Sequence, residues 1–245
     1  MRLIRVYIEQ PLAAGARVEL RGSAHEHLTR VLRLGAGDAV TLFNGDGSDY
    51  PAVILELRRG AAAVEVKAVA SARAESPLAI TLVQGIARAE RMDLVVQKAT
   101  ELGVAAIQPV AAERSVVKLD AATRAKKVAH WRGIAIAACE QCGRARLPEV
   151  ADPLPLPDWL GRPARAGLRR LQLEPDAGRS LAGWSAGAAA VELLVGPEGG
   201  LTETERDVAR QTGYLSCRLG PRVLRSETAA IAALAVLQAA AGDLK

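Results

Sequence analysis

Two short turns near the C-terminus carry the residues that are best suited to bind a ligand or to catalyse a reaction. The first, Gly-Pro-Glu-Gly-Gly at 196–200, follows an apolar run at 191–195. Its glycines lack side chains, so a ligand can approach the backbone N–H and C=O groups. The turn is either a cradle for a small molecule or an ordinary strand-to-helix connection. It is not a dinucleotide fingerprint, which needs G-x-G-x-x-G, nor a phosphate loop, which needs G-x-x-x-x-G-K-[ST].

The second turn, at Gly220 and Pro221, leads to Arg225, Ser226 and Glu227 at the start of an apolar run. Ser226 is predicted to be the N-cap of a last helix, and Glu227 suits the positive end of the helix dipole. Arg225 has no such explanation, because a cation is unfavourable at that end of a helix. We therefore interpret Arg225 as a functional residue.

The other reactive side chains do not combine into a site. Cys139 and Cys142 have C-x-x-C spacing, but no second pair and no histidine lies near them in the sequence. We interpret them as structural thiols rather than metal or redox groups. His25, His27 and His130 do not cluster with acids or cysteines. No metal site is expected, and no Ser-His-Asp arrangement supports hydrolysis.

Composition limits the class of protein. The 245 residues are 50% hydrophobic, and the net charge of +5 is compatible with an RNA partner without naming one. Three cysteines, an odd number, argue against a disulfide scaffold and for a reducing compartment. Charges interrupt the N-terminal apolar residues, so no signal peptide is expected, and the run at 229–241 is too short to span a bilayer. We expect a soluble, cytoplasmic protein.

The N-terminal part has the pattern of short strands. Runs rich in Val, Leu and Ile occur at 17–21, 39–43, 52–57 and 62–69, and a helix fits 24–34. Asn44-Gly45-Asp46-Gly47 is a strong turn signal between two of these runs. The pattern predicts a small β-barrel-like module, followed by a linker at 70–77.

From residue 78 onward strands and helices alternate. Strands are predicted at 80–84, 104–110, 168–173, 191–195 and 215–219, and helices at 90–102, after Asp120, after Thr202 and after Ser226. Thr202 and Glu205 form a capping box, whereas the proline-rich segment 148–163 is predicted to be a loop. This alternation predicts a mostly parallel α/β sheet, which places ligands at the carboxyl ends of its strands.

The two turns, GPEGGLTETE and LGPRVLRSETAAIAAL, resemble the signature of the RsmE-type methyltransferases of the SPOUT class. The resemblance extends over nearly the whole chain and includes HLTRVLR at 27–33, RMD at 91–93, QKATELGV at 97–104 and EQCGR at 140–144. One departure is Arg88-Ala89, where relatives often have Lys-Gly.

The resemblance implies an enzyme that methylates N3 of a uridine in 16S (small-subunit) ribosomal RNA with S-adenosylmethionine. It implies a PUA-like β-barrel module at residues 1–73 that helps to hold RNA. It also implies a SPOUT-type α/β domain with a trefoil knot at 77–245, and a homodimer. Knots are almost absent from proteins in general, so the alternating pattern alone would not have predicted one.

The resemblance also suggests roles for residues. Arg225 would stabilise the charge on the uracil as N3 loses its proton, and Glu227 would accept that proton or orient Arg225. The expected cofactor-binding residues are Leu173, Glu174, Val195, Gly196, Pro197, Glu198, Gly199, Gly200, Leu219, Gly220, Val223, Leu224, Ser226 and Thr228. The expected RNA-binding residues are Arg5, Arg30, Arg33, Arg88, Arg91, Arg114 and Arg144.

Two other functions remain open. A different SPOUT enzyme, acting on a ribose 2′-OH of another RNA, would share the knot but usually not the whole N-terminal module. A non-catalytic RNA-binding module would need no cofactor, so calorimetry with S-adenosylmethionine separates it from an enzyme.

Overall fold

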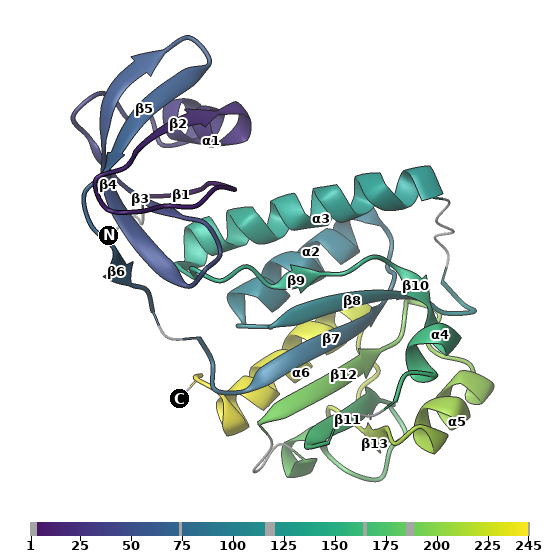
Figure 1. Ribbon diagram of the computed structural model, residues 1–245. Coiled ribbons are helices and arrows are strands. Elements are labelled where there is room, and N and C mark those ends of the chain that lie inside the picture. The colour runs from purple at the N-terminus through teal and green to yellow at the C-terminus, as the bar shows by residue number, and fades with distance from the viewer. Residues whose placement is uncertain (1–3, 74, 116–120, 164–165, 185–188, 245) are drawn as a thin grey trace. The chain divides into compact units, whose positions relative to one another are not determined.

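The computed structural model describes residues 4–73, 75–115, 121–163, 166–184 and 189–244 (Figure 1). The chain divides into two compact units. The N-terminal unit comprises Met1–Glu75 together with Ile136–Leu147, and the C-terminal unit comprises Ser76–Ala135 with Pro148–Lys245. The segment Ile136–Leu147 therefore belongs to the N-terminal unit, although it follows part of the C-terminal unit in the sequence.

The N-terminal unit is built on a six-stranded sheet of order β1-β3-β4-β5-β2, in which β6 pairs with β4. β1 and β3 are parallel and the other pairs are antiparallel. In β2, Val18 and Leu20 are buried between exposed charged residues, which is the two-residue period of a half-buried strand. The strands are β1 Arg5–Tyr7, β2 Arg17–Arg21, β3 Ala39–Phe43, β4 Ser48–Arg58, β5 Ala61–Val66 and β6 Ala70–Ser71.

The helical piece predicted at 24–34 is present, but it begins and ends earlier and its second half is not α-helical. The structure has a short helix α1, Gly22–Glu26, which continues into a π-helical turn at His27–Val31. The glycine-rich turn at 44–47 joins β3 to β4, as predicted.

The C-terminal unit contains a seven-stranded sheet of order β10-β8-β7-β12-β11-β13, in which β9 pairs with β8. Every pairing in it is parallel, as predicted. The segment 148–163 is not simply a loop, because it adds two edge strands and helix α4. The strands are β7 Ala79–Gly85, β8 Ala106–Ala111, β9 Glu149–Val150, β10 Leu154–Pro155, β11 Leu168–Leu173, β12 Ala190–Val195 and β13 Leu215–Cys217.

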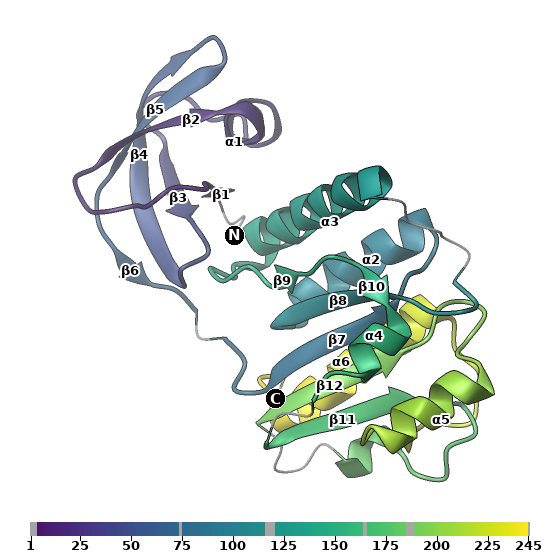
Figure 2. The same cartoon turned by 45° about the vertical axis from the view of Figure 1, so that its right-hand side comes forward.

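Helices cover both faces of this parallel sheet (Figure 2). Leu82 and Leu193 belong to the core that contains α2 and α6, whereas Val83 and Leu194 belong to the core that contains α4 and α5. Both faces are thus buried, which explains the nearly continuous apolar strand sequences. The helices are α2 Ala89–Glu101, α3 Ala121–Cys142, α4 Leu156–Leu160, α5 Glu203–Gln211 and α6 Ser226–Ala241, with a 3₁₀ turn at Leu181–Trp184.

The helix ends follow from local sequence. The capping box of Thr202 and Glu205 at the start of α5 is confirmed, because each side chain bonds the other residue's backbone N–H. α2 ends before Gly103, which has a φ of +77°. The predicted cap Asp120 lies outside the described residues. Among the described helices, none is long and apolar enough to cross a bilayer.

Candidate functional site

A pocket of about 440 Å³ opens at the carboxyl ends of β11, β12 and β13. Its walls are the loop 173–175, the glycine-rich loop 195–201 and the segment 217–226, with Arg91 from α2 and Arg206 from α5. Arg114, in the loop after β8, also lines it. The volume lies within the range of ligand sites, and the position is the one that parallel sheets use for ligands.

The glycine-rich loop needs its glycines because neighbouring backbone lies very close to it. A Cβ placed on Gly199 would lie 2.9 Å from the Cβ of Arg114. Gly85, at the end of β7, is equally constrained, since its Cβ would lie 2.4 Å from the backbone nitrogen of Pro197. The guanidinium of Arg114 also donates to the carbonyl oxygen of Gly199 at 3.2 Å. The loop is therefore fixed by contacts with the end of β7 and with Arg114 in the loop after β8.

Ser226 joins this loop to the last helix. Its hydroxyl donates to the carbonyl oxygen of Gly196 at 2.5 Å and accepts from the side-chain amide of the buried Gln84 at 3.0 Å. The prediction that Ser226 is the N-cap is wrong: Arg225 occupies that position, and no side chain caps the helix. The hydroxyl bonds the glycine loop instead, so it holds the loop, β7 and α6 together.

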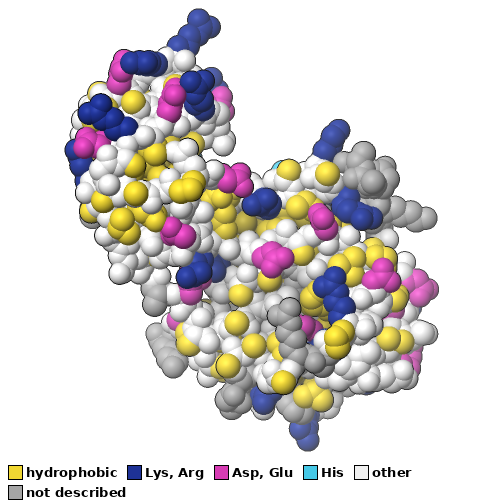
Figure 3. Space-filling view, in the orientation of Figure 1, with side chains coloured by type: hydrophobic (Ala, Val, Ile, Leu, Met, Phe, Trp, Pro, Cys, Tyr) yellow, Lys and Arg dark blue, Asp and Glu magenta, His cyan; other side chains and the backbone are white. Residues whose placement is uncertain are grey.

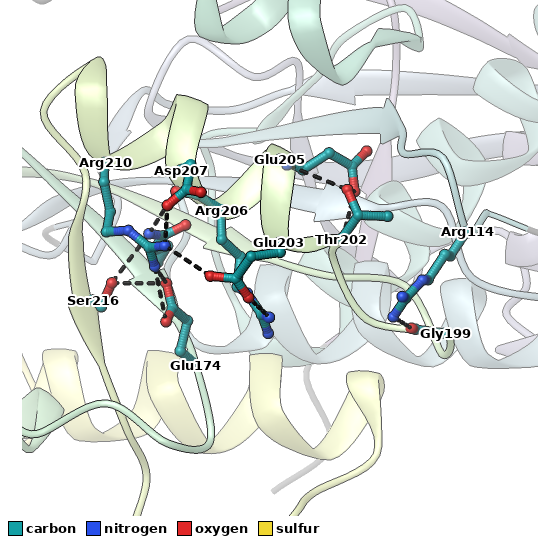
Figure 4. A network of polar contacts seen from close by, with 11 residues as sticks. Arg114, Glu174, Gly199, Thr202, Glu203, Glu205, Arg206, Asp207, Arg210 and Ser216 are labelled. Carbon is teal, nitrogen blue, oxygen red and sulfur yellow. Dashed lines mark hydrogen bonds and ion pairs between the residues drawn. The ribbon is translucent and has the colours of Figure 1, made fainter.

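The carboxylate of Glu174 is held in place by a network of ion pairs (Figure 4). The Arg210 guanidinium lies 2.9 and 3.3 Å from its two oxygens, and the Ser216 hydroxyl donates to it at 2.7 Å. Arg210 also pairs with Glu203 and Asp207 of its own helix. Because Glu174 already has a cationic partner, its position in the pocket does not depend on a ligand.

Arg91 lies between two carboxylates. Its guanidinium is 3.4 Å from Glu198 and 3.9 Å from Glu227, and each glutamate keeps one buried oxygen, Oε2, without a hydrogen-bond partner among the described residues. Burial alone would raise the pKa of Glu198. The backbone N–H groups of Arg88 and Glu198 and the charges of Arg91 and Arg88 outweigh that effect and lower the pKa below 4.5.

The pocket has an excess of positive charge. Six arginines and two glutamates line it, and both glutamates have arginine partners. Three of the six, Arg218, Arg222 and Arg225, have side chains that make no hydrogen bond or ion pair with any residue that the structure describes. These three guanidiniums are available to an anionic ligand.

Cys217 is a thiol in the pocket wall, but it is not poised to react. It is fully buried, and burial raises its pKa to about 12, with the charge of Glu174 adding to the effect. Burial likewise raises the pKa of Cys139 to about 12. Both thiols are therefore protonated at neutral pH. In the described parts of the chain, no cluster of three His, Cys, Asp or Glu residues is arranged to hold a metal ion.

The structure brings most of the predicted cofactor residues together. Of the fourteen, all except Thr228 line the pocket, and Arg225 lines it as well. Thr228 is exposed on α6. Glu227 does not line the pocket and is buried beside Arg91. The cation next to Glu227 is thus Arg91 rather than Arg225.

The predicted RNA-binding arginines separate into three groups. Arg91 and Arg114 line the pocket, and Arg30, Arg33 and Arg88 are exposed, Arg33 with a left-handed φ of +59°.

Arg5 and Arg144 are different, because both are engaged inside the N-terminal unit. Arg5 is 4% exposed, pairs with Asp49 at 2.7 Å and stacks 4.7 Å from the centre of the Phe43 ring. Arg144 pairs with Glu75 at 2.5 and 3.0 Å. Their packing accounts for them without RNA.

Sequence reasoning missed several residues of the pocket. Arg206, Arg218 and Arg222 line the pocket. Gln84 and Arg210 do not line it, but they hydrogen-bond Ser226 and Glu174, which do. A glutamine in an otherwise apolar buried strand was a signal for Gln84. The position of Arg222 within the second turn was a signal for that residue. No sequence pattern predicts the ion pair between Arg210 and Glu174.

Comparisons with known proteins agree with this geometry. An RNA methyltransferase domain model matches residues 74–238, and an RNA methyltransferase PUA domain model matches residues 20–67. The chain is 33% identical to the ribosomal RNA small subunit methyltransferase E of Buchnera aphidicola subsp. Schizaphis graminum, an alignment that covers 99% of this chain and 98% of the relative. For the protein of that name from Bacillus subtilis, identity is 29% with 95% of each chain covered.

Solved structures agree over the same length. A methyltransferase of Legionella pneumophila in complex with SAM has a TM-score of 0.95 at 41% identity, with 100% of each chain covered. The ribosomal RNA small subunit methyltransferase E of Neisseria gonorrhoeae, bound to S-adenosyl methionine, has a TM-score of 0.92 at 36% identity, covering 99% of this chain and 100% of that one.

Fold and site thus define an RNA methyltransferase with a PUA domain. Within that class the chain belongs to the ribosomal RNA small subunit methyltransferase E family, the RsmE-type family that its sequence resembles. The predicted fold class is confirmed in its two parts, a SPOUT-type α/β domain with a parallel sheet and a PUA-like module before it.

Proposed function

We propose that this chain methylates N3 of one uridine in small-subunit ribosomal RNA, with S-adenosylmethionine as the methyl donor. The observation that carries the proposal is the pocket at the carboxyl ends of the strands. Its two glycine-bearing walls are the stretches that resemble the family signature, in a chain that aligns end to end with structures that contain this cofactor.

The residues of the pocket fit the cofactor. The glycine loop presents backbone instead of side chains, and the buried Oε2 of Glu198, which has no hydrogen-bond partner among the described residues, can accept a hydrogen bond from a ligand. We propose that the loops 173–174, 195–200 and 219–226 hold S-adenosylmethionine, and that Ser226 acts by fixing the glycine loop. When bound, S-adenosylmethionine supplies a methyl group that its sulfonium makes electrophilic.

The protein must supply position and a route for a proton. Uracil N3 carries a proton that leaves during methylation, and the negative charge that remains on the base needs a cation. Arg225 is the proposed cation, because it lines the pocket and has no described partner. Glu227 is the proposed proton acceptor, through its unpartnered Oε2, and Arg91 holds the other oxygen.

RNA would reach this pocket through its arginines. A uridine paired in a duplex cannot expose N3, so the target must be unpaired or turned out of its helix. We propose that Arg88, Arg91 and Arg114 contact RNA near the pocket, and that Arg30 and Arg33 contact it on the N-terminal module. We thus assign RNA binding mainly to residues 1–73 and methyl transfer to residues 77–245.

The homodimer implied by the resemblance and the cytoplasmic location expected from the composition belong to the same proposal. Sedimentation of the purified protein tests the first, and a dimer at micromolar concentration is expected.

Two measurements with purified protein test the proposed function. Calorimetry should detect one S-adenosylmethionine site per chain, and digestion of methylated ribosomal RNA followed by mass spectrometry should yield N3-methyluridine. A 2′-O-methylated nucleotide in its place would contradict the assigned atom. Absence of cofactor binding would favour a non-catalytic RNA-binding module.

A further inference from the structure

A second hollow, of about 260 Å³, lies entirely within the N-terminal unit. It is formed where the turn after β3, strand β6 and the segment just after α3 meet. Its polar lining consists of Ser48, Ser71, Arg73, Glu75 and Arg146. None of these residues belongs to the cofactor pocket.

Charges around this hollow leave two arginines without partners. Asp46 accepts from the Tyr50 hydroxyl at 2.5 Å and from the backbone N–H of Ser48 at 2.7 Å. Asp49 and Glu75 are paired with Arg5 and Arg144. Each of the three acids is thus satisfied.

The side chains of Arg73 and Arg146 make no ion pair or hydrogen bond within the residues that the structure describes. Both are exposed. On the face shown in Figure 3, basic and acidic side chains are interspersed and basic ones form no continuous field. Two guanidiniums without partners beside one hollow make a local site for an anion.

The position of Arg146 is set by the glycine turn. A Cβ on Gly47 would lie 2.9 Å from Nε of Arg146, so the guanidinium rests against this glycine. Gly47 also has a φ of +98°, which favours glycine. The turn at 44–47 therefore does more than connect two strands, because it shapes the surface on which Arg146 lies.

We propose that this hollow binds a backbone phosphate of the RNA substrate, with Arg73 and Arg146 as the cations and Ser48 and Ser71 as further hydrogen-bond donors. A planar guanidinium donates to phosphate oxygens in a fixed geometry, and such contacts set the register of RNA without reading its sequence. The inference rests on the proposed function and assigns a positioning site to the N-terminal unit, which includes Ile136–Leu147.

Salt dependence of RNA binding tests the site. Fluorescence anisotropy would measure the affinity of the full-length protein for a fragment of small-subunit ribosomal RNA at several salt concentrations. For single-stranded RNA each lost phosphate contact lowers the salt slope by about 0.7, which weakens binding about fivefold near 0.1 M salt. The double variant Arg73→Ala/Arg146→Ala removes both cations from the same phosphate and should show this full change, and each single variant should show part of it.

Matched variants separate this site from general charge effects. Arg59→Ala removes an exposed arginine on the turn between β4 and β5, and it should leave the slope at the wild-type value. Arg73→Lys and Arg146→Lys keep the charge and should retain most of the slope. S-adenosylmethionine affinity, measured by calorimetry, should be unchanged in all of them, so failure of this proposal is distinguishable from failure of the proposed function.

Two results would overturn the inference. One is an unchanged salt slope in the double variant while its cofactor affinity and unfolding temperature match those of the wild type. The other is binding of inorganic phosphate at this site, lost in the double variant, without any effect of the variant on RNA affinity.

Discussion

Replacement of Gly85 by alanine tests how the pocket is built. The new Cβ would lie 2.4 Å from the backbone nitrogen of Pro197 and 2.9 Å from the carbonyl carbon of Gly196. Both atoms belong to the main chain of the glycine loop, so no side chain can rotate away. Either the loop or the end of β7 must move, and the hydrogen bond from Ser226 to Gly196 would be strained with it.

The loss in free energy of unfolding that this substitution causes can be estimated. Overpacking a well-packed site costs roughly 1–3 kcal/mol, and a clash with backbone belongs at the upper end. In a protein of this size about 3 kcal/mol corresponds to a fall of roughly 6–12 °C in the unfolding temperature. Because the loop is a wall of the pocket, affinity for S-adenosylmethionine should fall at least tenfold, the equivalent of about 1.4 kcal/mol.

Thermal unfolding and calorimetry measure both effects. Gly133→Ala is the matched control, since Gly133 is exposed within α3 and its Cβ would meet nothing within 4 Å. Alanine there should stabilise the protein by about 0.5–1 kcal/mol and leave cofactor affinity unchanged. If Gly85→Ala proves too unstable to purify, Ser226→Ala perturbs the same junction more mildly. Wild-type stability and affinity in Gly85→Ala would refute the proposed packing.

Other substitutions test separate parts of the site. Glu227→Gln should lower the methylation rate roughly 10²–10⁴-fold with little change in cofactor affinity, and a near-wild-type rate would exclude it as the proton acceptor. Arg225→Ala should cost roughly 10²–10³ in rate, again at saturating cofactor. Arg210→Ala removes the cation that holds Glu174, so we expect weaker cofactor binding and an unchanged rate at saturation. The pKa of Glu198 is lowered in the folded protein, so its stabilising effect is present above pH 4.5 and lost as the pH falls through the folded-state value. Urea titrations should therefore show a difference between wild type and Glu198→Gln at pH 6 that shrinks in acid; a constant difference would contradict this assignment.

Elements that depend on residues a few positions apart could be predicted from the sequence alone. The apolar stripe of α2, the capping box at Thr202 and the glycine after α2 depend on residues a few positions apart. The parallel strands were recognisable because both faces of the sheet are buried. The segment 148–163 was misjudged, since its prolines suit edge strands and the first turn of α4 as well as they suit a loop.

Contacts between distant residues were not predictable in the same way. Ser226 looked like an N-cap, yet its hydroxyl bonds Gly196, thirty residues earlier in the chain. Arg91 was expected to bind RNA, and no spacing rule places it between Glu198 and Glu227. The knot belongs in the same category, because it came from family resemblance and not from periodicity.

The central claim is that this chain places one methyl group on N3 of a uridine in the small ribosomal subunit. Mass-spectrometric mapping of ribosomal RNA from cells with and without the gene tests it most directly. We expect a single N3-methyluridine to disappear from the small-subunit RNA and to return when the wild-type gene is restored, but not when Glu227→Gln is supplied. An unchanged map would contradict the account.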